Sequence, residues 1–167
     1  VKYVRKRTIV PMKIFEAGKF TLNLSKKTYV MGILNVTPDS FSDGNKWFNI
    51  ESAVGHALQM KNDGADIIDI GAQSTRPGHT KITPQEELMR LMPVLKVLKG
   101  RINVPISVDT FYPEVAKEAL NEGIDIINDV NGFKNEEMMK VAAKSNCGCI
   151  VMHDGTNAQM KNFFDLQ

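Results

Sequence analysis

Polar side chains follow two apolar, strand-like runs directly, where a rigid strand can hold them against a ligand. Residues 29–34 lead into residues 35–44, a loop rich in hydroxyl and carboxylate groups. Residues 67–70 lead into a second loop, in which Arg76 follows two hydroxyl residues and precedes a Pro-Gly turn. A guanidinium offers paired donors in one plane, so this loop predicts a phosphate or carboxylate clamp. A surface Arg that pairs with a nearby acid is the alternative.

Two more strand-like runs end in side chains that can recognise a ligand. Asp109 follows residues 104–108 and can face a site or cap the helix that begins near Pro113. Thr110 is nearer to that helix, and its hydroxyl can supply the cap instead. Asn128 follows residues 124–127, and its amide both donates and accepts, which suits the edge of a heterocycle. A buried structural Asn is equally consistent with this pattern.

The elements that carry these residues alternate between strand and helix. Continuous apolar runs predict strands buried on both faces at residues 29–34, 67–70, 104–108, 124–127 and 149–152. Apolar residues at three- and four-residue steps predict helices at residues 50–62, 84–99, 113–121 and 136–144. Residues 13–22 read as a hairpin about a Gly turn. Such alternation indicates a parallel sheet with right-handed crossovers.

An α/β fold of this kind is either an open doubly wound sheet or a closed barrel. No G-x-G-x-x-G motif follows the first long strand, which disfavours a dinucleotide fold. The polar residues gather at the carboxyl ends of strands, where TIM (β/α)8 barrels place their sites. A complete barrel takes about 250 residues, so the 167 residues hold roughly the first five β/α units after the hairpin. We expect a basic arm at residues 1–12 and a barrel domain at residues 13–167.

Composition excludes several classes of partner. The net charge is only +2, so no strong field attracts nucleic acid, and we interpret the basic N-terminal residues as a solvated arm. No apolar run approaches the roughly 18 residues that span a bilayer, and the first residues lack the apolar segment of a secretory signal. We therefore expect a cytoplasmic protein that binds small molecules, with no membrane and no nucleic acid among its partners.

Four motifs together resemble one family. Residues 31–44 and 69–78, followed by Ser-Val-Asp-Thr at 107–110 and Ile-Ile-Asn-Asp at 126–129, resemble the dihydropteroate synthases, pterin-binding barrel enzymes of folate synthesis. The resemblance runs from about residue 13 to the end of the chain. It implies condensation of 4-aminobenzoate with 6-hydroxymethyl-7,8-dihydropterin diphosphate, with release of diphosphate.

The resemblance also implies roles for particular residues. Asn35 would help to hold Mg²⁺ at the diphosphate, and Asp109 and Asn128 would bind the pterin. Asp109 and Arg76 would be the catalytic pair, with the carboxylate facing charge that develops on the pterin. The remaining residues implied in substrate binding, as apolar walls or as loops around the aminobenzoate, are Phe41, Thr75, Pro77, Val130 and Met152. We expect Asn35, Arg76, Asp109 and Asn128 to converge on one rim.

Some family motifs have no counterpart in these residues. The later strands of the family carry Asp-Pro-Gly-Phe-Gly-like, Ser-Arg-Lys and Arg-Val-His motifs, which the sequence lacks. A non-catalytic pterin- or anion-binding fragment is therefore one alternative. A methyltetrahydrofolate-binding methyltransferase barrel is another, which the Thr-Pro-Asp-Ser-Phe-Ser loop disfavours. Full-length members are expected to be homodimers, with the interface outside this chain.

Overall fold

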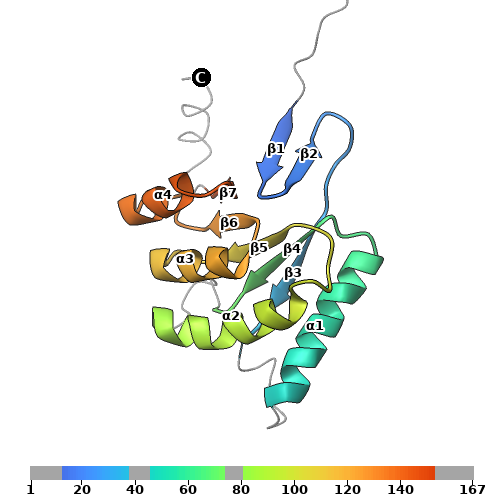
Figure 1. Ribbon diagram of the computed structural model, residues 1–167, viewed down its shortest axis with the longest axis vertical. Helices are drawn as coiled ribbons and strands as arrows, with labels where there is room; N and C mark the ends of the chain where they lie inside the picture. The colour runs from blue at the N-terminus through green and yellow to red at the C-terminus, as the bar shows by residue number, and fades with distance from the viewer. Residues whose placement is uncertain (1–12, 38–45, 74–80, 153–167) are drawn as a thin grey trace, which may run out of the picture.

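The chain folds as a small hairpin followed by strands that alternate with helices, as Figure 1 shows. A computed structural model describes residues 13–37, 46–73 and 81–152. The strands are β1 (Ile14–Ala17), β2 (Phe20–Asn23), β3 (Met31–Asn35), β4 (Ile67–Gly71), β5 (Ile106–Asp109), β6 (Ile126–Asp129) and β7 (Gly148–Val151). The helices are α1 (Lys46–Asn62), α2 (Pro84–Leu98), α3 (Pro113–Glu122) and α4 (Glu136–Ala143).

Strands β3 to β7 form one parallel sheet in chain order, and β1 pairs antiparallel with β2 in a separate hairpin. The predicted hairpin and parallel order are therefore confirmed. Several strands begin and end later than predicted. As a result, Asn35, Asp109 and Asn128 lie within the last residues of their strands and not in the loops beyond them.

One of two predicted helix caps is present in the structure. Thr83 caps α2, because its Oγ1 accepts the N–H of Glu86 at 3.2 Å. The prediction that Thr110 caps α3 is wrong. The N-cap position of α3 is Tyr112, which makes no side-chain cap, and Thr110 Oγ1 instead accepts the N–H of Tyr112 at 3.2 Å within the preceding loop. No helix in the described ranges is long and apolar enough to cross a bilayer.

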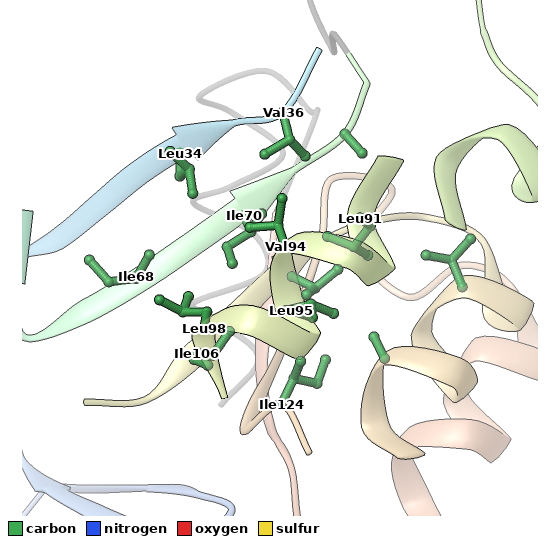
Figure 2. Close-up of a cluster of buried hydrophobic side chains, with 14 of the residues drawn as sticks. Leu34, Val36, Ile68, Ile70, Leu91, Val94, Leu95, Leu98, Ile106 and Ile124 are labelled. Carbon is green, nitrogen blue, oxygen red and sulfur yellow. The ribbon is translucent and has the colours of Figure 1, made fainter. Parts of the chain in front are cut away.

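The larger core lies between the sheet and the helices. Ile68 and Ile70 of β4 are fully buried in the same cluster as Val94 and Leu98 of α2, which Figure 2 shows in close-up. Fully burying such a side chain contributes about 1.5–3 kcal/mol. This packing fixes the side of the sheet that faces the helices, and every second residue of each strand must point to the other side.

The hairpin covers the amino ends of the strands on that other side. Ile67 and Ile126, the first residues of β4 and β6, are buried with Ala17 and Leu22 of the hairpin. The N–H of Gly18 donates to the carbonyl of Asn146, just before β7, at 2.9 Å. The hairpin therefore closes the amino end of this face, opposite the carboxyl ends of the strands.

Burial on both faces holds for the central strands only. All five residues of β4 and all four of β6 are buried. In β3, by contrast, Ile33 is 60% exposed, and in β7 Val151 is 62% exposed. The prediction is wrong for these two strands because each has only one neighbour among the described strands.

Candidate active site

The register of the parallel sheet places the predicted polar residues in one row. Asn35 pairs with Gly71, Gly71 with Asp109, and Asp109 with Asn128. Paired residues of neighbouring strands point to the same face of a sheet, and here that face is the one turned away from the helices. Three of the four residues expected to converge therefore do so. Arg76 lies outside the described residues.

Gly71 leaves a gap in the middle of this row. A Cβ at that position would lie 3.6 Å from Cβ and Oδ2 of Asp109 and 3.8 Å from Oδ1 of Asn35. A methyl group would thus fit against both side chains without a clash, and it would fill the space between them. The glycine leaves this space between the two side chains unfilled by a side chain of its own.

A second polar row lies one step closer to the amino ends of the strands. Asp69 of β4 pairs with Ser107 of β5, and they are 3% and 0% exposed. Nδ2 of Asn128 donates to Oδ2 of Asp69 at 3.1 Å and links the two rows. A buried carboxylate is costly unless it is compensated, so this cluster is poorly explained by packing alone. Sequence reasoning missed Asp69, although a carboxylate within an apolar run was a signal.

The charge of Asp109 is set by its surroundings. Burial, reinforced by repulsion from Asp69, Glu87 and Asp129, raises the pKa of Asp109 from 3.8 to about 7. Burial also raises the pKa of Asp69, and the side chains of Ser107 and Asn128 partly oppose that rise. Near neutral pH, a ligand that brings positive charge or N–H donors would favour ionisation of Asp109.

Two buried oxygens in the first row have no hydrogen-bond partner. Within the part of the chain that the structure describes, these are Oδ1 of Asp109 and Oδ1 of Asn128. Oδ1 of Asn128 only accepts, and so does Oδ1 of Asp109 while that carboxyl is ionised. Buried polar atoms in native proteins almost always have a partner, so these oxygens suit a ligand with several N–H groups on one edge.

Helix α2 supports the residues that follow β4. Glu87 is fully buried, and its Oε2 accepts Nε2 of Gln73 at 2.6 Å. Nη1 of Arg90 donates to the carbonyl of Ala72 at 3.1 Å. Burial raises the pKa of Glu87. Local patterns do not indicate this role, because Glu87 lies among polar residues at the start of a helix.

The other predicted site residues are only partly placed. Val130 is half-buried directly after β6, and Met152 is 48% exposed directly after β7. The N–H of Met152 donates to the carbonyl of Asp129 at 3.3 Å, which keeps this residue near the end of β6. Both lie at the end of the sheet that carries the row, and their role as apolar walls stays a prediction. Phe41, Thr75, Arg76 and Pro77 lie outside the described residues.

A surface pocket of about 790 Å³ lies elsewhere, beside the amino ends of α3 and α4. Its lining includes Phe111, Tyr112, Lys117 and Glu137 and contains none of the predicted site residues. Charges of both signs line it, so it suggests no particular ligand. The row at the carboxyl ends of the strands is the better candidate for chemistry.

Comparison with known proteins decides the family. The model of the family described as "Pterin binding enzyme" matches residues 31–164. The chain belongs to this family. Dihydropteroate synthase of Clostridium beijerinckii is 46% identical over 149 residues, which are 89% of this chain and 55% of that protein. A folate synthesis bifunctional protein of Arabidopsis thaliana is 49% identical over 160 residues, 93% of this chain and 33% of that protein.

Solved structures of the family confirm the predicted barrel. A Xanthomonas albilineans dihydropteroate synthase with 4-aminobenzoic acid superposes with a TM-score of 0.81 at 38% identity, over 92% of this chain and 58% of that one. Clostridium difficile dihydropteroate synthase, solved in the presence of pteroic acid, superposes with a TM-score of 0.77 at 48% identity, over 84% of this chain and 57% of that one. The five-stranded parallel sheet is a partial (β/α) barrel, and the chain spans a little over half the length of these structures.

Proposed function

We propose that this chain forms the pterin-binding part of a dihydropteroate synthase. The enzyme would join 4-aminobenzoate to 6-hydroxymethyl-7,8-dihydropterin diphosphate and release diphosphate. The observation that carries the proposal is the row of Asn35, Asp109 and Asn128 about the gap at Gly71. Relatives named dihydropteroate synthase, and family structures with pteroic acid, 7,8-dihydropteroate or 4-aminobenzoic acid, support it.

Recognition of the pterin follows from the buried acceptors. A pterin carries an amino group and ring N–H groups along one planar edge. The unpartnered Oδ1 atoms of Asp109 and Asn128 are neighbours in the row and could accept from such an edge. A site built to accept hydrogen bonds rejects analogues that lack the donors, because its buried oxygens would stay unpaired.

The reaction would use the same carboxylate. The amine nitrogen of 4-aminobenzoate attacks the exocyclic methylene carbon, the bond from that carbon to the diphosphate oxygen breaks, and the amine loses a proton. Positive charge develops on the pterin as diphosphate departs, and ionised Asp109 would stabilise it within a partly buried site. Arg76 would bind the departing diphosphate, a role that stays a prediction.

A divalent cation is compatible with the residues at the rim. Asn35 is exposed at the end of β3 and offers an amide oxygen, a ligand type that Mg²⁺ accepts. The described residues contain no cluster of three His, Cys, Asp or Glu side chains that could hold a metal alone. Asn35 would therefore share Mg²⁺ with substrate phosphates and water, and the bound ion would neutralise charge on the leaving diphosphate.

The substitution Gly71→Ala tests the site without removing a polar group. The added methyl makes ordinary contacts, so we expect a folded protein whose affinity for the dihydropterin diphosphate is at least about tenfold weaker, equivalent to about 1.4 kcal/mol. Isothermal titration calorimetry measures this affinity. Gly55→Ala, in α1 with no neighbour within 4 Å of its Cβ, is the control and should bind as the wild type does. Equal affinity of Gly71→Ala and wild type would refute the proposed pocket.

Turnover separates an enzyme from a binding fragment. Diphosphate release is measured with both substrates and Mg²⁺, for the 167-residue chain and for the chain joined to the later strands of a full-length relative. Product from the completed barrel, lost in Asp109→Ala, is the expected result. Pterin binding without product in either form would favour a non-catalytic pterin-binding protein. A cytoplasmic location and a homodimer stay predictions.

A further inference from the structure

Asp69 is a buried carboxylate whose presence is explained neither by the packing of the fold nor by the proposed reaction. It is 3% exposed in the middle of β4, on the face turned away from the helices. Other buried carboxylates of the sheet bind backbone N–H groups: Asp125 accepts that of Ile106 at 3.0 Å, and Asp129 accepts those of Asn131 and Phe133. Asp69 is instead hydrogen-bonded by side chains: Nδ2 of Asn128 donates to it at 3.1 Å, and the side chain of Ser107 also contributes.

This contact determines which way the Asn128 amide points. An ionised carboxylate only accepts hydrogen bonds, so the amide must turn its NH2 group toward Asp69. Oδ1 of Asn128 is then left without a partner among the residues that the structure describes. With an apolar residue at position 69, nothing in this contact would distinguish the two amide orientations.

We propose that Asp69 is a positioning residue, which holds the Asn128 amide so that its oxygen accepts a hydrogen bond from the ligand. The inference rests on the proposed pterin site. A reversed amide would place N–H donors against the N–H groups of a pterin edge, so that one hydrogen bond is lost and two donors face each other. A preset orientation avoids this mismatch and spares the cost of ordering the amide when the ligand binds.

Two substitutions distinguish the role of Asp69 as a hydrogen-bond acceptor from the volume that its side chain fills. Asp69→Leu replaces the carboxylate with an apolar side chain of similar size and removes the acceptor of the Asn128 amide. Asp69→Asn keeps an oxygen that can accept from Asn128. We expect Kd for the dihydropterin diphosphate to rise about tenfold in Asp69→Leu, the range for one lost hydrogen bond between ligand and protein. In Asp69→Asn it should rise much less.

Asp125→Asn is the matched control. Asp125 is also buried, at 6% exposure, and it lies at the amino end of β5 and β6, away from the row. Its substitution should weaken the fold and leave pterin affinity as in the wild type. If Asp125→Asn weakened binding as much as Asp69→Leu, the effect would come from general destabilisation, and the positioning role would be refuted.

The NMR signals of the Asn128 side-chain NH2 give a readout that needs no ligand. In the wild-type 167-residue chain, we expect slow solvent exchange of the Asn128 side-chain proton that is hydrogen-bonded to Asp69. In Asp69→Leu, we expect the same proton to exchange faster. Rapid exchange in the wild type overturns the inference even if Asp69→Leu does not fold. Tight pterin binding that is unchanged in Asp69→Leu also overturns it. Absence of pterin binding by the wild type would refute the proposed function, while the exchange rates would still test the amide orientation.

Discussion

The charge of Asp109 connects the site to the stability of the fold. Its pKa rises from 3.8 to about 7 on folding, chiefly because burial disfavours the carboxylate and nearby carboxylates repel it. A carboxyl whose pKa is raised in the folded state stabilises the protein only while it is protonated. Its contribution is present below the unfolded pKa and is lost as the pH rises through about 7. The proposed site would therefore lower the stability of the fold at neutral pH.

Asp109→Asn should therefore stabilise the protein at pH 8 and have little effect near pH 4. We expect a gain of about 1–3 kcal/mol at pH 8, less than the full shift would give because Asp109 is only partly buried. Urea unfolding at both pH values measures it. Asp63→Asn, at an exposed position after α1, is the control for the removal of one negative charge. An equal effect of Asp109→Asn at both pH values would contradict the raised pKa.

The sequence predicted part of this site, for a definable reason. Asn35, Asp109 and Asn128 each follow an apolar run, and the carboxyl ends of parallel strands share one edge of a sheet. This rule does not find Asp69, which lies inside its apolar run, or Glu87, which lies near the start of a helix. The position of Asp69 within an apolar run was a signal, but the partners of the two residues, Asn128 and Gln73, are far away in the sequence and no local pattern contains them.

At the scale of elements, the hairpin and β7 are fitted closely to each other. Gly148, the first residue of β7, lies so near to β1 that a Cβ would be 2.6 Å from Cζ of Phe15 and 2.8 Å from the carbonyl oxygen of Glu16. The side-chain atom could move, whereas the carbonyl belongs to the backbone of β1. The hairpin therefore requires glycine here in order to close the amino ends of the strands.

Gly148→Ala should displace the hairpin and destabilise the fold. Overpacking of this kind costs about 1–3 kcal/mol, and thermal unfolding would show it as a lower Tm. Hydrogen exchange should become faster in β1 and β2 but not in α2. Gly55→Ala, which adds a methyl without neighbours, should not lower Tm. Unchanged exchange in the hairpin would mean that it does not pack on β7 as described.

The kinds of element were predictable, whereas their exposure was not. Strand and helix follow from periodicity and from residues such as Thr83 and Pro84, which act locally. Burial of a strand depends on its neighbours in space. The apolar residues of β3 and β7 resemble those of β4, yet Ile33 and Val151 are exposed because each strand pairs on one side only among the described strands.

At the scale of the whole molecule, β3 and β7 each have one edge that pairs with no other described strand. An unpaired parallel strand presents N–H and C=O groups that can pair with another chain, and closed barrels avoid this by having no edges. The solved relatives extend well beyond the part that this chain matches, which is 58% of the Xanthomonas albilineans protein. The 167-residue polypeptide should therefore associate through a sheet edge when studied alone.

Val151→Lys tests whether the edge at β7 drives this association. Val151 is 62% exposed, and a charged side chain on an edge strand opposes pairing with a second strand. Sedimentation velocity across a concentration series should show less association for Val151→Lys than for the wild type. Met89→Lys is the control, because Met89 is 71% exposed on α2, where the backbone is already paired within the helix. If Met89→Lys reduced association as much as Val151→Lys, the reduction would come from the lost apolar surface or the added charge. It would not come from the edge of the sheet at β7, and the prediction would be wrong.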